Sequence, residues 1–118
     1  MDKKKVILVL GASGGIATEL NKFLNKRYLI YLFYFKNKPK HLKNTKSIRL
    51  DLQNYSKIKS TLNQMEIKNK KIIILNLAAV KFDKISYNID SSDLEKTFKI
   101  NTFSFLNFVQ YFLPQMIK

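Results

Sequence analysis

The sequence contains no cysteine and no tryptophan, only two prolines and only three glycines. The lack of cysteine excludes disulfides and thiolate chemistry. No uncharged apolar stretch reaches the length of about 18 residues that a membrane-spanning helix needs, and the run behind the N-terminal lysines is too short for a signal peptide. We therefore expect a soluble, cytoplasmic protein without a membrane partner. Its 118 residues, 46% of them hydrophobic, suffice for one folded domain.

Acidic residues are scarce as well, with eight Asp and Glu against 22 Lys and Arg and a formal net charge of +14. A basic domain can indicate nucleic-acid binding. Here, however, all the cations except Arg27 and Arg49 are lysines scattered along the chain, whereas proteins that read nucleic acid cluster their cations and use arginine. The charge therefore predicts a solvated surface and no nucleic-acid partner. The single histidine, His41, offers no metal site.

Four apolar runs have the composition of β-strands, at residues 5–10, 29–35, 47–52 and 71–77. The last of them, KIIILNL, is apolar at nearly every position, which is typical of a strand covered on both faces in a parallel sheet. Helical patterns lie between the runs. The order of elements therefore predicts an α/β fold, a parallel sheet with helices on both faces, of which only four strands are present.

Two apolar stripes at helical spacing predict helices: Ile16, Leu20, Phe23 and Leu24, and Ile58, Leu62 and Met65. After the fourth strand, Ser92 and Glu95 have the spacing of a capping box, so a long helix is expected from about Asp93 towards Gln115. Residues 36–46 are compatible with a loop or a short helix.

All three glycines lie in one stretch, VILVLGASGGIATEL, where a strand passes directly into a helix. Such a turn leaves the first N–H groups of the helix unpaired, and their partial positive charge suits a phosphate. The small residues Gly11, Gly14, Gly15 and Ala17 would let a pyrophosphate approach the backbone closely. The stretch therefore predicts a nucleotide-binding turn.

The end of the second strand indicates which nucleotide. Sites that select NAD carry an Asp or Glu there, which bonds the ribose hydroxyls. This chain has no acidic residue between Glu19 and Asp51, and its second strand runs into FYFKNKPK with Lys36, Lys38 and Lys40. Because cations at this point suit a 2′-phosphate, the sequence predicts NADP(H) in preference to NAD(H).

Four motifs together resemble the short-chain dehydrogenase/reductase family. GASGGIA is similar to the family's glycine motif, LDL at 50–52 to the end of its third strand, NLAA at 76–79 to the segment after its fourth strand, and residues 99–118 to its long helix. The resemblance implies a Rossmann-like fold. The residues it implies are cofactor contacts from Gly11, Ser13, Gly14, Gly15, Ile16, Asp51, Leu52, Asn76 and Ala78, and a catalytic Asn101 that holds a water of the proton relay.

By this resemblance, residues 1–118 are the N-terminal, NADP(H)-binding portion of an enzyme that transfers hydride between cofactor and a small carbonyl or alcohol, such as a 3-oxoacyl-carrier-protein reductase. The family's Ser and Tyr-x-x-x-Lys pair belong to a fifth strand and the helix after it, which this sequence does not reach. The pairs Tyr34–Lys38 and Tyr55–Lys59 are expected by chance and lie away from the nicotinamide. We therefore expect cofactor binding without carbonyl reduction.

Two other interpretations stay open. Ala17 and Ala79 replace glycines of the motifs, and GASGGIA also has the spacing of the extended branch, whose members act on nucleotide sugars as epimerases, dehydratases or reductases. The spacing from Asn76 to Asn101 and the LPQM ending favour the classical branch. The other interpretation is a non-catalytic NADP(H)-binding protein, complete at this length. In each case the apolar fourth run and the broadly apolar final helix predict a homo-oligomer.

Overall fold

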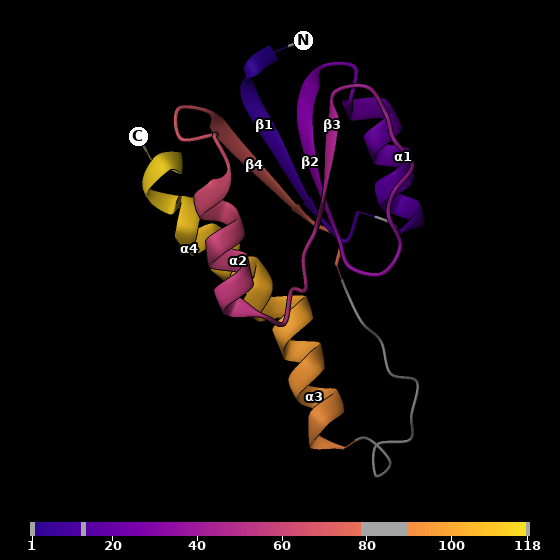
Figure 1. Ribbon diagram of the computed structural model, residues 1–118, viewed down its shortest axis with the longest axis vertical. Helices are drawn as coiled ribbons and strands as arrows, with labels where there is room; N and C mark the ends of the chain where they lie inside the picture. Colours follow the sequence, from indigo (N-terminus) through magenta and orange to yellow (C-terminus); the bar gives the residue numbers. More distant parts are fainter. Residues whose placement is uncertain (1, 13, 79–89, 118) are drawn as a thin grey trace.

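The structure is a computed structural model that describes residues 2–12, 14–78 and 90–117. Its sheet has the order β3-β2-β1-β4, all parallel, with β1 (Asp2–Leu10), β2 (Tyr28–Tyr34), β3 (Thr45–Arg49) and β4 (Lys71–Asn76). Helix α1 (Gly15–Leu24) lies on one face, and α2 (Tyr55–Gln64) and α4 (Ser104–Met116) lie on the other (Figure 1). The predicted parallel sheet with helices on both faces is confirmed.

The two central strands are apolar on both sides because helices cover both faces of the sheet there. Residues Val6–Leu10 of β1 are each 2% exposed or less, and Ile30–Phe33 of β2 are buried as well. Burying a large aliphatic side chain stabilises a fold by about 1.5–3 kcal/mol. Burial of β1 and β2 therefore stabilises the fold.

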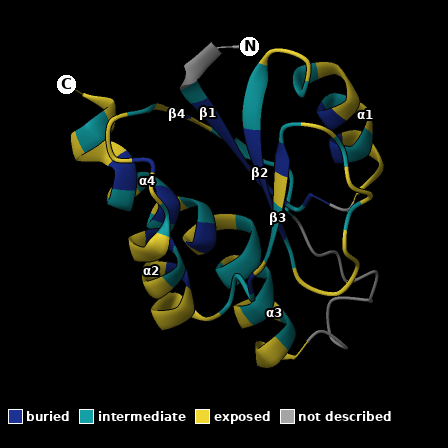
Figure 2. Cartoon of the chain, turned by 45° about the horizontal axis from the view of Figure 1, so that its top comes forward, coloured by how far each residue is buried: buried dark blue, intermediate teal, exposed yellow. Residues whose placement is uncertain are grey.

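The sheet separates two apolar cores, visible as the dark blue segments in Figure 2. The larger core lies between the sheet and α2 and α4, and it includes Phe33 and Phe108, whose rings meet edge to face with centroids 5.1 Å apart. The smaller core lies under α1 and includes the small residues Ala12 and Ala17. The core under α1 thus includes smaller side chains than the core under α2 and α4.

Strand β4 corrects one prediction. Its sequence is that of a strand covered on both faces, yet Ile73 is 39% exposed, while Ile72 is buried. The cause is the sheet order, because β4 lies at one edge of the described sheet and the core under α1 is centred on β1 and β2. Ile73 therefore lies on a face that no described helix covers fully.

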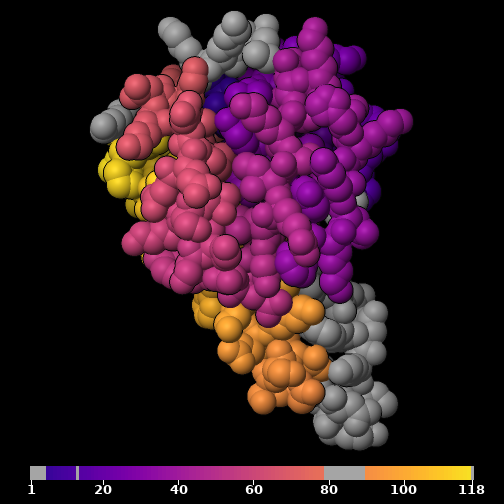
Figure 3. Space-filling model, viewed as in Figure 1, coloured from indigo at the N-terminus to yellow at the C-terminus, as the bar shows by residue number. Residues whose placement is uncertain are grey.

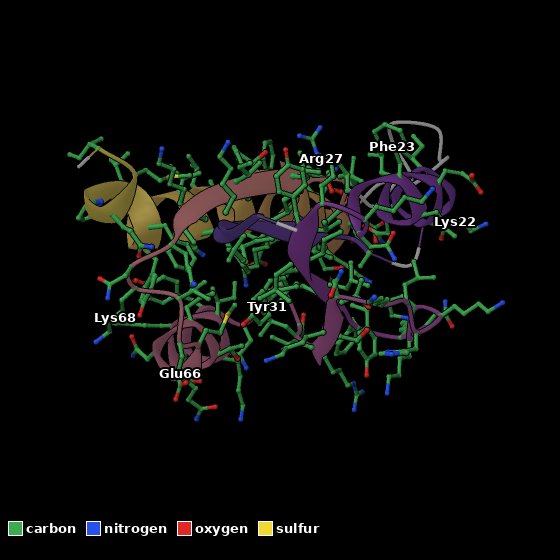
Figure 4. The ribbon with its side chains drawn as sticks, turned by 90° about the horizontal axis from the view of Figure 1, so that it is seen from above. Lys22, Phe23, Arg27, Tyr31, Glu66 and Lys68 are labelled. Carbon is green, nitrogen blue, oxygen red and sulfur yellow. The ribbon has the colours of Figure 1, made fainter. Side chains whose placement is uncertain are left out.

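Helix α1 is where the sequence predicts it, but only part of its predicted apolar stripe is buried. Leu24 packs against the smaller core. Ile16 and Phe23 of the predicted stripe are 71% and 74% exposed, whereas Ala17 and Asn21 are buried. Figure 4 shows Phe23 and Lys22 on the side of α1 away from the sheet. The prediction was based on the largest apolar residues. A helix that starts at a glycine turn lies close to the sheet, so small residues are needed where the helix and the sheet touch.

Helix α2 confirms its predicted stripe, since Ile58 and Leu62 are buried and Met65 packs against the larger core. Its first turn is capped by Asn54, whose side-chain oxygen accepts a hydrogen bond from the backbone N–H of Lys57 at 3.1 Å. An Asn at this position satisfies a backbone donor that would otherwise lack a partner.

The predicted long helix is present as three successive segments, α3 (Ser91–Phe98), a π-helical turn η2 (Lys99–Phe103) and α4. Its N-cap is Asp90 and not Ser92, because the Asp90 carboxylate accepts hydrogen bonds from both the Asp93 N–H and the Ser92 hydroxyl, each at 2.8 Å. In the space-filling view α3 projects beyond the main body (Figure 3). No described helix has the length and apolar character that crossing a membrane requires.

As predicted, the apolar residues of the final helix occupy more than one face. Phe108 and Phe112 are buried against the sheet, whereas Leu106 and Leu113 are each 45% exposed. For residues 36–46 the structure has a loop up to Asn44, and β3 begins at Thr45.

Candidate functional site

The glycine turn lies at the carboxyl ends of the strands, which converge in the lower middle of Figure 1. Gly11 has φ +77°, and a Cβ added there would lie 2.6 Å from the Cα of Ala78. On either side of it, the Ala12 N–H donates to the Phe33 carbonyl at 3.1 Å and the Leu77 N–H donates to the Leu10 carbonyl at 2.9 Å. Only glycine fits at this point, because the turn lies directly against the chain leaving β4.

The start of α1 presents backbone donors without a capping side chain. Its N-cap is Gly14, which has no side chain to accept from the first N–H groups, and its first turn has no acidic residue. Beside it, nothing lies within 4 Å of the position a Gly15 Cβ would take. The dipole and the unpaired N–H groups of such a turn favour an anion. Ser13, also predicted here, lies outside the described residues.

A cavity of about 380 Å³ opens beside this turn. Its walls come from the glycine turn, the ends of β2 and β3, the segment after β4, and the long helix. Its size is that of a small-molecule site, for which volumes of about 300–1,000 Å³ are usual. The lining residues are Gly11, Gly14, Phe33, Tyr34, Phe35, Lys36, Asn37, Leu50, Asp51, Leu52, Gln53, Leu77, Ala78, Lys96 and Ile100.

Asp51 follows β3 in the cavity wall and is held by a local turn. Its Oδ1 accepts a hydrogen bond from the Gln53 N–H at 3.0 Å, and its backbone carbonyl accepts one from the Asn54 N–H at 3.0 Å. Such Asx turns fix the carboxylate relative to the backbone. The turn therefore keeps Asp51 at the wall between Leu50 and Leu52.

Asn76 and Asn101, which are far apart in the sequence, meet at the end of β4. The Asn76 side chain accepts a hydrogen bond from the Ala78 N–H at 3.3 Å and donates one to the Asn101 carbonyl at 3.5 Å. Asn101 lies within η2, and π-helical turns occur frequently at functional sites. Neither residue lines the cavity, so they mark a second location at the same edge of the sheet.

The structure brings most of the sequence-predicted cofactor residues together. Those that line the cavity are Gly11, Gly14, Lys36, Asp51, Leu52 and Ala78. Gly15 and Ile16 begin α1 beside it, whereas Lys38 is exposed and does not line it. The roles of these residues remain predictions.

Nine further lining residues were not predicted: Phe33, Tyr34, Phe35, Asn37, Leu50, Gln53, Leu77, Lys96 and Ile100. Phe35 and Asn37 flank Lys36 in the sequence. Lys96 and Ile100 are four residues apart on the long helix, and this spacing places them on one face. Counting back from Asn101 along the helix would have found this pair, because Ile100 directly precedes it.

Comparison with known proteins decides the family. A family model described as short chain dehydrogenase matches residues 5–118. The chain belongs to the short-chain dehydrogenase family. The resemblance inferred from GASGGIA, LDL, NLAA and the long helix is therefore confirmed, together with the Rossmann-like fold class.

Individual relatives within the short-chain dehydrogenase family are distant. A protein of Saccharomyces cerevisiae named "Uncharacterized oxidoreductase TDA5" is 29% identical over 118 residues, covering 95% of this chain and 36% of its own length. A short chain dehydrogenase family protein of Francisella tularensis superposes with a TM-score of 0.81 at 22% identity, over 96% of this chain and 46% of its own. The chain thus spans less than half of the length of either relative.

Another solved structure, 4-hydroxyisoleucine dehydrogenase complexed with NADH, has a TM-score of 0.82 at 20% identity, over 96% of this chain and 50% of its own. The closed form of serine dehydrogenase complexed with NADP⁺ has a TM-score of 0.79 at 19% identity, over 95% of this chain and 49% of its own. At such identities the likeness concerns the fold. The two complexes hold different nicotinamide cofactors, so they do not distinguish NAD(H) from NADP(H).

The residues present fit the nicotinamide dinucleotide that this family uses. The turn at Gly11 has no room for a side chain, the start of α1 offers backbone N–H groups, and the cavity lies beside both. The pyrophosphate would lie at Gly14 and Gly15, and the adenosine in the cavity between Asp51 and Ile100. When bound, the dinucleotide supplies the hydride donor or acceptor of the reaction.

Proposed function

We propose that residues 1–118 form the cofactor-binding part of a short-chain oxidoreductase of the classical branch, and that this part binds NADP(H) in preference to NAD(H). The observation that carries the preference is the position of Lys36. It lines the cavity immediately after β2, where an NAD site would place a carboxylate. The nearest acidic residues in the sequence, Glu19 and Asp51, lie outside this strand end.

The substrate of the whole enzyme would be a small carbonyl or alcohol. A carbonyl that accepts hydride develops oxyanion charge, which a positioned acid must neutralise. Tyr34 lines the adenosine cavity, and Tyr55 is 58% exposed beside the groove between α2 and α4. We expect neither tyrosine to act as that acid, so the 118-residue chain should bind cofactor without transferring hydride. NADPH oxidation that disappears in Tyr55→Phe would contradict this.

The test is a calorimetric titration of the 118-residue chain with NADP⁺ and with NAD⁺. The double variant Lys36→Glu, Lys38→Glu should lower the affinity for NADP⁺ by about tenfold or more, because it places carboxylates beside the 2′-phosphate. NAD⁺ affinity should change little. The matched control, Lys43→Glu with Lys46→Glu, makes the same change of charge at exposed residues that do not line the cavity. Equal wild-type affinity for both cofactors would refute the preference.

A further inference from the structure

Arg49, the last residue of β3, has a side chain that contacts Phe35, a residue of the cavity wall. It pairs with Tyr34 of β2, and its side chain reaches the next residue, Phe35. The Arg49 Nε donates a hydrogen bond to the Phe35 carbonyl at 3.2 Å, and the guanidinium carbon lies 5.3 Å from the centre of the Phe35 ring. A hydrogen bond and a cation–π contact therefore hold the guanidinium on Phe35.

Phe35 and the following Lys36 both line the cavity. The guanidinium is thus placed at the strand end where a dinucleotide fold meets the 2′ position of the adenosine ribose. Two strands contribute the cations at this point, Lys36 from the end of β2 and Arg49 from the end of β3. In the sequence the two residues are separated by a loop and a strand, and the pairing of β2 with β3 brings the two strand ends side by side.

The chemistry of arginine suits this position. A guanidinium has five N–H donors in a planar fork that matches the oxygens of a phosphate, and the bond to Phe35 uses only the one on Nε. Among the described residues, no hydrogen bond or ion pair of the remaining donors is formed, and Arg49 is exposed to solvent. Because the side chain is already held in place, less conformational entropy would be lost when it binds a ligand.

We infer that Arg49 contacts the 2′-phosphate of NADP(H), as the partner of Lys36, and that Phe35 positions it. The inference rests on the proposed NADP(H) binding and adds a specificity-determining residue outside the second strand and the glycine turn. The 2′-phosphate then contacts two cations, the planar guanidinium of Arg49 and the flexible ammonium group of Lys36.

The experiment uses the 118-residue chain and two probes without nicotinamide, adenosine 2′,5′-bisphosphate and adenosine 5′-monophosphate, titrated by calorimetry. Arg49→Gln should lower the affinity for the bisphosphate by about tenfold, which is the loss expected for a charge-assisted contact. The affinity for the monophosphate should be nearly unchanged. Arg49→Lys keeps the charge without the fork and should give an intermediate loss. The control is Lys46→Gln, because Lys46 makes a similar contact on the same strand, 5.8 Å from the centre of the Tyr31 ring, away from the cavity.

Thermal melting should show all three variants folded, since both side chains are exposed. Arg49→Gln that weakens both probes equally, or neither, overturns the assignment. If the Lys36 and Lys38 double variant loses the bisphosphate while Arg49→Gln does not, the proposed NADP(H) binding stands and the role of Arg49 falls. If the wild-type chain binds both probes equally, the preference for NADP(H) and the role of Arg49 fall together.

Discussion

The two faces of the sheet differ in what they bury. Under α2 and α4 the core is built of large side chains, with Phe33 and Phe108 in edge-to-face contact. Under α1 it includes Ala12 and Ala17, and it buries the polar Asn21. The first face fills volume, which stabilises the domain. The second lets a helix begin close to the strand ends, which is what a phosphate-binding turn needs, and its packing contributes less to stability.

The largest expected effect concerns the face under α4. Phe108→Ala should lower the free energy of unfolding by about 3–5 kcal/mol, because it leaves a cavity against Phe33. Its matched control is Phe23→Ala on α1, where the side chain is 74% exposed and the loss should be within about 0.5 kcal/mol. Urea denaturation followed by circular dichroism measures both. Similar losses at the two positions would contradict the contrast between the faces.

The glycine turn should separate stability from binding. Gly11→Ala combines a positive φ with a backbone overlap and should cost about 2–3 kcal/mol, whereas Gly15→Ala should be nearly neutral because its Cβ would enter open space. Gly15→Asp should fold yet lose NADP⁺ binding, since its carboxylate would lie where we propose that the pyrophosphate binds. Thermal melts and calorimetry distinguish these outcomes. Gly15→Asp binding as tightly as Gly15→Ala would mean that the phosphate lies elsewhere.

Asn21 offers a smaller effect of opposite sign. It is 2% exposed in α1, and its Oδ1 lacks a hydrogen-bond partner among the described residues. Asn21→Ala removes a buried acceptor and introduces a better helix former, so it should stabilise the chain by about 1 kcal/mol. Asn25→Ala is the control, because Asn25 donates to the Lys43 carbonyl and its loss should destabilise. A destabilised Asn21→Ala would show that this amide contributes a contact of its own.

These contrasts also show which features of the fold can be predicted from the sequence. The strands and the α2 stripe were predicted because apolar runs and the spacing of Ile58 and Leu62 follow from local geometry. The buried face of α1 was predicted only in part: Leu24 packs against the smaller core, but Ile16 and Phe23 are exposed, since hydrophobic spacing favours large residues and close packing favours Ala17. Likewise, KIIILNL gave no sign that Ile73 would be exposed, because what covers a strand depends on the sheet order.

For the cavity wall, the sequence identified residues that follow strands, namely Gly11, Lys36 and Asp51, because a parallel sheet brings the carboxyl ends of its strands to one edge. It missed Lys96, which comes from a helix distant in the sequence, and the contact of Arg49 with Phe35, which depends on the pairing of β2 and β3. Contacts between elements require the register, and the register is not visible in composition or spacing.

The smallest expected effect on stability concerns the uncovered edge of the sheet. Among the described residues no strand pairs with the outer edge of β4, where Ile73 is half-exposed, and such an edge favours pairing with a second copy. Ile73→Lys should change the free energy of unfolding by less than about 1 kcal/mol, because the side chain is only partly buried, yet it should shift the chain towards monomer in sedimentation equilibrium at micromolar concentration. Leu113→Lys makes the same change on the exposed face of α4, where Leu113 is 45% exposed, and should leave association unchanged if it runs through β4. If only Leu113→Lys shifts the chain towards monomer, association is assigned to the final helix. A monomeric wild type would refute association through either surface.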